Sequence, residues 1–263
     1  MKKFITITAS LLIAFSFAKT VLADGHQVYG PYPITLKGYD GDKTNSVKYT
    51  GQMARHALHD SLKALVKTGD VAKMMAYYNG EDGLEIIAPA SKGDFVIKQT
   101  MISEIGSGNL SGKMYKGAIP GWGNLTGPEA IEHMIAKAGE VEGGFDPNTG
   151  MDYTQLISKF AMGAVFYNQA VNSYLGSKME VGQKPNNKPY KDGAYYTGKE
   201  HSWDEAFGYW GSAAHALTLN AEQNYNVAKK KDMASADFNG DGVVDVYSEY
   251  TYAHAYYASS YDK

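Results

Sequence analysis

The chain has no cysteine among its 263 residues. This absence excludes disulfide bonds, thiolate metal sites, iron–sulfur clusters, a cysteine nucleophile and a lipid attached at a cleavage-site cysteine. Two catalytic patterns are also absent, the His-Glu-x-x-His of zinc peptidases and the Gly-x-Ser-x-Gly turn of serine hydrolases. Any metal that this protein binds must therefore be held by nitrogen and oxygen ligands.

Long apolar runs are absent beyond the N-terminus. There, Lys2 and Lys3 precede an apolar stretch over residues 4–17, and Val21-Leu22-Ala23 offers a small-residue cleavage site. We therefore predict a signal peptide over residues 1–23, with Asp24 as the mature N-terminus. No later stretch approaches the roughly 18 uncharged apolar residues that a membrane-spanning helix needs. The sequence predicts one helical domain over residues 24–263, periplasmic or secreted, in a protein that does not span a membrane.

Basic residues are scarce, with 25 Lys and Arg against 28 Asp and Glu. Three of the lysines lie in the predicted signal peptide, which leaves 22 basic residues against 28 acidic ones. This negative balance argues against nucleic acid or an anionic membrane surface as a partner. Tyrosine, by contrast, occurs 21 times. Its ring packs while its hydroxyl stays polar, which suits amphipathic core edges and, as the alternative, sugar-binding surfaces.

Helical periodicity dominates the pattern of apolar residues. Helices are predicted over residues 52–68, 71–78, 153–175 and 247–259, from Pro128 onward, and from Thr197 or Ser202 to about residue 230. Frequent glycines between residues 79 and 127 predict a segment that is mostly loop, with room for a small hairpin. We therefore predict a mainly α protein, an antiparallel helical bundle with one irregular glycine-rich insertion.

Within the predicted helix 153–175, one apolar stripe recurs at helical spacing. It consists of Leu156, Phe160, Ala164, Tyr167, Val171 and Tyr174. Such a stripe is normally the core-facing side of a helix, and we predict that role here in preference to ligand binding.

A histidine among three carboxylates is the densest chemical cluster, in Glu200-His201-Ser202-Trp203-Asp204-Glu205. Two interpretations are open, and they differ in where the helix begins. If Ser202 is the N-cap, Glu205 completes its capping box, and the cluster serves only to start a helix.

The second interpretation begins the helix at Thr197, with Glu200 completing the capping box. His201, Asp204 and Glu205 then share one helical face, with neighbouring Cβ atoms roughly 5–6 Å apart. This arrangement offers an imidazole and carboxylates to a transition metal.

Two further clusters combine histidine with carboxylates at helical spacing. His56 and Asp60 lie one turn apart with His59 between them, and Glu129 and His133 are spaced alike. Metal sites in helical bundles are built from several facing helices, so these clusters are candidates to complete a site with the first. Surface charge pairs follow the same spacing and are the competing interpretation for each.

A second metal motif lies over residues 237–249. Oxygen ligands stand at positions 1, 3, 5, 7 and 9 of an EF-hand-type calcium loop, and a glycine for the turn stands at position 6. These residues are Asp237, Asn239, Asp241, the Val243 carbonyl, Asp245 and, at the turn, Gly242. Position 12 holds Ser248 in place of glutamate, and Glu249 follows one residue late. We predict that this loop binds a calcium ion that holds two helices together. The alternative is an Asn/Asp-Gly turn without an ion.

Four motifs spread over nearly all of the predicted mature chain form one pattern. They are Gly51-Gln52-x-x-Arg55, the helix 153–175 with Lys159-Phe-Ala-Met-Gly163-Ala164-x-Phe-Tyr-x-Gln169, the stretch Tyr196-Thr-Gly-Lys-Glu200-His201-x-Trp203-Asp204-Glu205-Ala206-Phe-Gly208-Tyr, and the loop that begins at Asp237. Together they resemble a family of secreted bacterial proteins related to the imelysins. The resemblance implies a mainly helical protein, periplasmic or attached to the outer membrane, that is linked to iron uptake.

The hallmark of imelysin-like proteins is a His-x-x-Glu pair, once interpreted as peptidase chemistry. By resemblance, His201 with Asp204 or Glu205 takes its place, although here aspartate stands at the i+3 position. An aspartate can bind a hard ion as a glutamate does.

These observations predict a noncatalytic periplasmic protein that captures an iron or copper ion and works with a periplasmic or outer-membrane uptake partner. The predicted transition-metal ligands are His201, Asp204, Glu205, Glu200, His56 and His59, and the predicted calcium ligands are Asp237, Asn239, Asp241, Val243, Asp245 and Glu249. Two other classes compete with this prediction. One is a metallopeptidase of imelysin type, and the other is a calcium-braced carbohydrate-binding or adhesion protein with Trp122, Trp203 and Trp210 as stacking surfaces.

Overall fold

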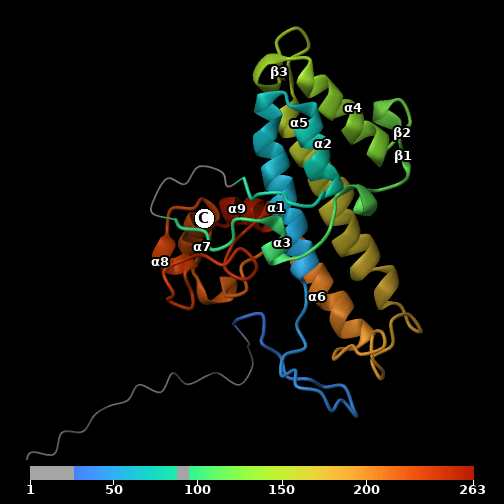
Figure 1. Cartoon of the computed structure of the whole chain (residues 1–263), viewed down its shortest axis with the longest axis vertical. Helices are drawn as coiled ribbons and strands as arrows, with labels where there is room; N and C mark the ends of the chain where they lie inside the picture. The colour runs from blue at the N-terminus through green and yellow to red at the C-terminus, as the bar shows by residue number, and fades with distance from the viewer. Residues whose placement is uncertain (1–26, 88–94) are drawn as a thin grey trace, which may run out of the picture.

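The computed structural model describes residues 27–87 and 95–263, and over these residues the chain is mainly α-helical (Figure 1). The predicted signal peptide lies outside the described residues. Nine α-helices and two small antiparallel sheets account for most of the regular structure in the described part. The prediction of a mainly α protein is therefore confirmed.

Helix α1 (Thr50–Leu65) is the centre of the larger group of helices, which we call the helical body (Figure 1). It packs against α2 (Val71–Asn79), α5 (Tyr153–Ala161) and α6 (Gly198–Trp210), and α4 (Gly127–Gly139) covers α2 and α5. A 3₁₀ turn, η1 (Val66–Thr68), continues α1 to the glycine stop at position 69. The predicted helices 52–68 and 71–78 are thus confirmed, as is the helix that begins at Pro128.

The helix starts follow ordinary capping chemistry. The Asp70 side chain accepts a hydrogen bond from the Lys73 backbone N–H at 2.9 Å and begins α2. Thr126 and Glu129 form a capping box at the start of α4, and the Asp152 side chain accepts from the Gln155 N–H at 3.1 Å to begin α5. Each cap satisfies a backbone donor that has no partner within the helix.

The continuation of α5 is a π-helix, η5 (Met162–Tyr174), with i→i+5 hydrogen bonds such as that from Leu175 N–H to the Ala170 carbonyl at 2.8 Å. This changes which side chains face inward. Val165 and Phe166 are fully buried, whereas Tyr167 is 52% and Val171 41% exposed. The predicted core stripe is therefore wrong at positions 167 and 171, because a π-helix turns less per residue than the α-helix on which the prediction was based.

The predicted helix from Thr197 to residue 230 is wrong, because it is two helices. Helix α6 ends at Trp210, where Gly211 takes the left-handed conformation with φ 81°. A Cβ at Gly211 would lie 2.9 Å from the His56 ring, so only glycine fits this end. A turn, η7 (Ala216–Thr218), then leads to α7 (Ala221–Ala228).

The last helix also starts later than predicted. Helix α9 (Ala253–Asp262) follows a non-helical stretch in which the Tyr252 N–H donates to the Gly211 carbonyl at 2.7 Å. That bond ties the start of α9 to the end of α6. Together with α7 and the single turn α8 (Met233–Ala236), α9 forms a smaller group beside the helical body (Figure 1).

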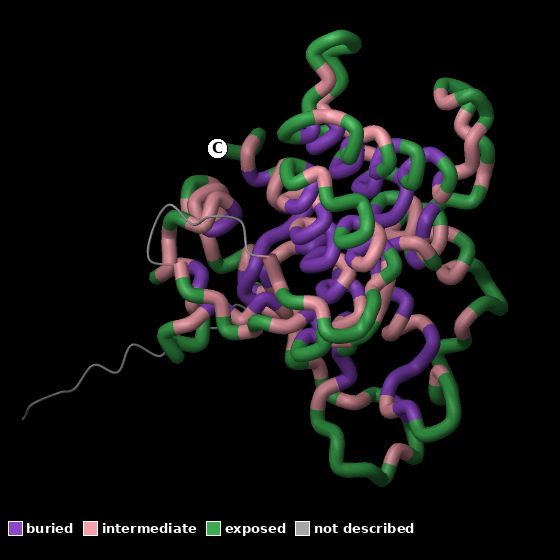
Figure 2. The backbone as a smooth tube through the Cα atoms, turned by 45° about the horizontal axis from the view of Figure 1, so that its top comes forward, coloured by how far each residue is buried: buried purple, intermediate pink, exposed green. Residues whose placement is uncertain are grey.

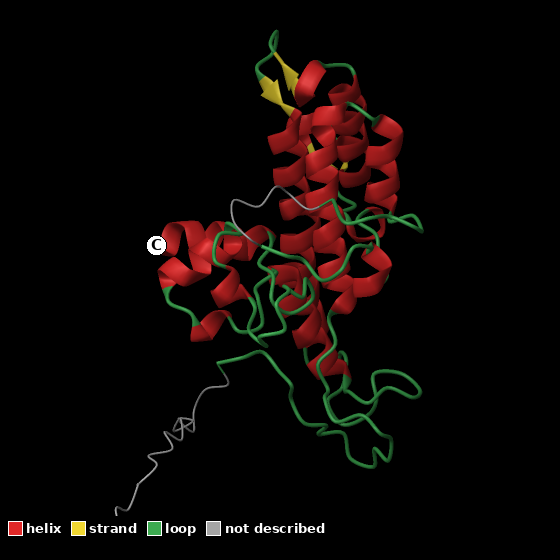
Figure 3. Cartoon of the chain, turned by 60° about the vertical axis from the view of Figure 1, so that its left-hand side comes forward, coloured by secondary structure: helices red, strands yellow, loops and turns green. Residues whose placement is uncertain are grey.

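The glycine-rich segment is irregular, as predicted. In its described part it contains the single turn α3 (Ile102–Ile105), the 3₁₀ turns η2 (Ser111–Lys113) and η3 (Pro120–Trp122), and a hairpin of β1 (Ala118–Ile119) with β2 (Leu125–Thr126). A second short hairpin pairs β3 (Phe145–Asp146), which follows the turn η4 (Glu142–Gly144), with β4 (Met151–Asp152). Another turn, η6 (Ser177–Met179), follows the π-helix. Figure 3 shows the β3–β4 hairpin at one end of the helices, and Figure 1 shows β1 and β2 at their side.

Buried residues concentrate where the helices of the body face one another (Figure 2). This interior contains polar groups as well as apolar ones, because His56 and His59 are only 0% and 3% exposed. Among the described helices, none combines the length and the apolar character that crossing a bilayer requires.

Candidate functional site

The start of α6 decides between the two interpretations of the charged cluster. Thr197 is the N-cap: its backbone N–H donates to Glu200 Oε2 at 2.7 Å, and its side chain accepts from the Glu200 N–H at 3.3 Å. Ser202 lies inside the helix and donates its hydroxyl to the Gly198 carbonyl at 2.9 Å. The helix therefore begins where the metal-binding interpretation requires it to begin.

Two of the predicted ligands converge. His201 Nε2 lies 3.6 Å from Glu205 Oε2, and the two side chains are only 13% and 15% exposed. The other carboxylate oxygen of Glu205 accepts from Gln52 Nε2 at 2.8 Å and from the Tyr174 hydroxyl at 3.0 Å. The Tyr196 ring stacks on the imidazole with centroids 4.6 Å apart. Side chains from α1, the π-helix and the loop before α6 thus fix the pair in place.

Burial lowers the pKa of His201, although the Glu205 carboxylate acts in the opposite direction. Lys48, Lys178 and Lys184 add to the lowering. The imidazole is therefore neutral near neutral pH, which is the form that binds metals. Its Nδ1 atom is buried and has no hydrogen-bond partner among the described residues.

Asp204 turns away from this pair. Its carboxylate accepts from the Tyr29 hydroxyl at 2.7 Å and from the Lys48 backbone N–H at 2.8 Å. Burial raises the pKa of Asp204 to about 6, with the Glu200 and Glu205 charges adding to the rise against these two hydrogen bonds. Asp204 thus holds the N-terminal segment onto α6.

Glu200, the remaining predicted ligand on α6, is also engaged elsewhere. Besides its role in the capping box, its carboxylate accepts from the Thr35 hydroxyl at 2.5 Å. It anchors a second point of the N-terminal segment.

The two histidines of α1 lie in the core. His56 donates from Nε2–H to the Gly208 carbonyl at 2.9 Å and stacks on Phe166 with ring centroids 4.1 Å apart. His59 Nε2 lies 3.1 Å from the Ser158 carbonyl. Within residues 27–87 and 95–263, no group of three or more His, Asp or Glu side chains is arranged to hold a metal ion. The six predicted transition-metal ligands are therefore not brought together, and only His201 and Glu205 form a pair.

The cluster at residues 129–133 has a structural part. The Glu129 carboxylate accepts from both the N–H and the hydroxyl of Thr126 at 2.7 Å. His133 is exposed and meets the edge of Trp122, with centroids 6.3 Å apart.

The loop at 237–249 has the turn that its sequence predicts. The Asp237 carboxylate accepts from the backbone N–H groups of Gly240, Asp241 and Gly242 at 2.8–3.1 Å. Gly242 has φ 86°, a conformation that favours glycine. Asn239 Oδ1 accepts from the Asp241 N–H at 2.8 Å. These bonds hold the side chains of the loop's first half around one tight turn.

Glu249 closes the loop from inside. It is only 3% exposed, and its carboxylate accepts from the N–H groups of Phe238, Asn239 and Asp245 at 2.8–3.1 Å. The predicted ligand Val243 lies next to Val244, whose backbone pairs with Val96 and Lys98 at 2.7 and 3.0 Å. The loop is thus attached to the glycine-rich segment.

A partner that the sequence analysis missed is Lys98. Its ammonium lies 3.4 Å from Asp241 Oδ2 and 3.7 Å from Asp245 Oδ2, beside two of the predicted calcium ligands. The Asp245 carboxylate also accepts from Gln99 Nε2 at 2.9 Å. Nothing in the local sequence of the loop indicates these partners, which come from a segment over 140 residues away.

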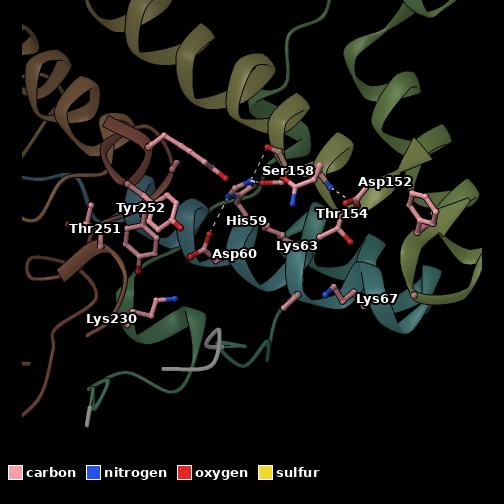
Figure 4. A pocket seen from close by; sticks show the side chains of 18 residues that line it. His59, Asp60, Lys63, Lys67, Asp152, Thr154, Ser158, Lys230, Thr251 and Tyr252 are labelled. Atoms are coloured by element: carbon pink, nitrogen blue, oxygen red, sulfur yellow. Dashed lines mark hydrogen bonds and ion pairs between the residues drawn. The ribbon is translucent and has the colours of Figure 1, made fainter. Parts of the chain in front are cut away.

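A cavity of about 740 Å³ was also missed (Figure 4). Among the residues that line it, Ser158 Oγ lies 3.2 Å from His59 Nε2, and His59 Nδ1 lies 3.5 Å from Asp60 Oδ1. This order resembles a serine hydrolase triad. However, His59 Nε2 also faces the Ser158 carbonyl, which only accepts, so this nitrogen carries a hydrogen and cannot remove one from the serine.

Residues 123–250 match the model of a family described as a domain of unknown function, DUF4856. The matched range contains the His201–Glu205 pair and all predicted calcium ligands. Comparisons with curated proteins and with solved structures found no match.

Proposed function

We propose that this protein is a noncatalytic metal-binding protein that captures an iron or copper ion between His201 and Glu205. The observation that carries the proposal is the 3.6 Å separation of His201 Nε2 and Glu205 Oε2 at a site where both side chains are largely buried. This distance is too long for a good hydrogen bond. It suits two ligands that share one ion about 2.1 Å from each.

The surroundings support the same proposal. A neutral imidazole with a carboxylate is a ligand set that first-row transition metals accept. Gln52 and Tyr174 hold the Glu205 carboxylate from behind, as outer partners commonly do in metal sites. The remaining coordination positions would belong to water or to ligands that arrive with the ion.

We further propose that the helical body is an imelysin-like antiparallel bundle and that the protein acts in the periplasm with an uptake partner. The loop at 237–249 would hold calcium through Asp237, Asn239, Asp241, the Val243 carbonyl and Asp245. Because this loop joins α8 to the segment before α9, calcium there would brace the smaller helical group against the glycine-rich segment.

Elemental analysis of the protein purified from its native compartment tests the transition-metal site. We expect about one iron or copper ion per chain in the wild type and a loss of at least tenfold in His201→Ala and Glu205→Gln, because each removes half of the protein's ligand set. His133→Ala is the matched control, since this exposed histidine lies on α4 and should leave the metal content unchanged. A wild-type protein without either metal, or a His201→Ala variant that retains it, would contradict the proposal.

Thermal unfolding with and without calcium tests the loop. We expect calcium to raise the melting temperature of the wild type by several degrees, and Asp241→Ala to abolish that rise, because it removes a ligand from the middle of the loop. Lys98→Met should strengthen the response to calcium, since it removes an ammonium 3.4 Å from Asp241 Oδ2. Equal melting temperatures in calcium and in chelator for both the wild type and Lys98→Met would show that the loop binds no calcium.

A further inference from the structure

The cavity of Figure 4 lies between α1, the first turns of α5, the residues after α7 and the start of α9. Its volume of about 740 Å³ falls within the range of about 300–1,000 Å³ that is usual for pockets with small organic ligands. None of the residues that line it belongs to the His201–Glu205 pair or to the loop at 237–249. It is therefore a separate site.

Positive charge gathers on the walls of this cavity. Lys63 on α1 and Lys67 on η1, the turn that continues it, stand four residues apart, and Lys230 follows the end of α7 (Figure 4). Burial lowers the pKa of Lys230 to about 8, against the effect of Asp60. The chain as a whole is acidic, with 28 acidic and 25 basic residues, whereas three lysines lie in the walls of this one cavity.

The two carboxylates in the same walls already have partners. Asp152 caps α5 by accepting from the Gln155 N–H at 3.1 Å. Asp60 lies 3.5 Å from His59 Nδ1, and although burial alone would raise the pKa of its carboxyl, His59 and Lys230 together lower it. Both acids keep their negative charge, so the lining contains three ammonium groups against two carboxylates and has an excess of one positive charge.

The start of α9 adds to the positive potential. Tyr252 and Ala253 line the cavity, and α9 begins at Ala253 after the N-cap Tyr252, whose side chain makes no cap hydrogen bond. The first turn of a helix carries partial positive charge on its backbone N–H groups. Ala253 has φ 37°, a strained conformation for alanine at the position where α9 enters the cavity wall.

Aromatic side chains form the remaining wall. Tyr252, Tyr256 and Tyr257 line the cavity beside Lys230. Although burial raises the pKa of Tyr257, the nearby Lys159 and Lys63 lower it below its ordinary value. Lys63, which lines the cavity, therefore lies near Tyr257, and the Lys159 ammonium lies 3.2 Å from the centroid of the Tyr257 ring.

We propose that the cavity binds a small organic anion, with a carboxylate held by Lys63 and Lys67 and an aromatic body packed against the tyrosines. The cations supply the attraction for the carboxylate, and the rings and the size of the cavity select an extended ligand over a simple inorganic ion. This site is independent of metal capture.

Isothermal titration calorimetry at low ionic strength tests this site with three probes of one shape: 2-naphthoate, the neutral 2-naphthamide and the cationic 2-naphthylmethylammonium. We expect the purified protein to bind naphthoate at least about tenfold more tightly than the amide and to reject the cation. Lys63→Met combined with Lys67→Met should weaken naphthoate binding by about tenfold or more. Lys63→Arg, which keeps the charge, should bind as the wild type does.

The matched control replaces two exposed lysines outside the cavity, Lys73→Met with Lys188→Met, and changes the net charge equally. This control, and His201→Ala, should leave naphthoate binding unchanged, provided that circular dichroism shows all variants folded. The proposal is overturned if the wild type does not bind naphthoate, if the amide binds equally well, or if the two double variants behave alike.

Discussion

Replacing Glu249 with leucine is expected to lower the free energy of unfolding by about 4 kcal/mol, because three backbone N–H groups lose their acceptor. The carboxylate is only 3% exposed, so water does not readily take its place. Glu249→Gln should lose about 2 kcal/mol, since the amide keeps one oxygen but turns an NH₂ group toward a backbone donor. Urea unfolding followed by tryptophan fluorescence measures both effects.

The measurement is best made in EDTA, because this separates the hydrogen bonds of Glu249 from its predicted role as a calcium ligand. Glu132→Leu is the control, an exposed position on α4 where a change within about 0.5 kcal/mol is expected. If the Glu249 variants are as stable as the wild type in EDTA and have a lower free energy of unfolding only in calcium, then the carboxylate acts through the ion and not through the loop backbone.

Protonation of His56 is the second large effect, and it predicts loss of stability in acid. Burial is the main cause that lowers the pKa of His56 to about 3, and the His59 charge adds to it. The unfolded chain, with an ordinary pKa of about 6.5, therefore binds this proton more readily. The contribution of neutral His56 to the free energy of unfolding is fully present above about pH 6.5 and is lost as the pH falls toward 3, by about 5 kcal/mol in total.

The variant His56→Gln isolates this contribution, because its amide can still donate to the Gly208 carbonyl but does not titrate. Its stability at neutral pH should be lower, since it loses the stacking on Phe166, yet its decline between pH 6.5 and 4 should be shallower than that of the wild type. Unfolding in urea at several pH values provides the two slopes. Parallel slopes in variant and wild type would mean that His56 does not govern acid unfolding.

Asp204 contributes with the opposite sign. Its pKa of about 6 lies above that of an unfolded aspartate, so the folded protein gains stability as this carboxyl takes up a proton between pH 6 and 4. Both the wild type and His56→Gln contain Asp204. Its contribution therefore cancels when the pH dependence of stability of one is subtracted from that of the other. His133→Gln, at an exposed site, should reproduce the wild-type slope.

Local sequence predicted the helices where spacing and caps act alone. Asp70 and Gly69 separate α1 from α2, and the residues at both positions are recognisable as a cap and a stop. Prediction failed at Gly211, which is followed by residues that also suit a helix. Its role depends on the His56 ring, which leaves no room for a Cβ, and His56 lies over 150 residues earlier. The π-helix was not predicted for a similar reason. Tyr167 and Val171 recur at α-helical spacing, and nothing in the local sequence indicates that both are exposed.

The sequence predicted which side chains of the candidate site share one face of a helix, but not which of them lie close to one another. Spacing placed His201, Asp204 and Glu205 together, and the helix does begin at Thr197. However, the direction of each carboxylate depends on distant partners: Tyr29 and the Lys48 backbone draw Asp204 one way, while Gln52 and Tyr174 hold Glu205 beside the imidazole. Spacing within a helix contains no information about such partners.

The contacts of Asp204 also bear on the order of folding. Tyr29, which stacks flat on Phe207 at 3.6 Å, and Lys48 reach an aspartate 175 and 156 positions later in the chain. Contacts of such long range form slowly, and these cannot form before α6 has been synthesised. The segment that contains Tyr29 and Lys48 is therefore synthesised early but anchored late, after the helices up to α6 have been made.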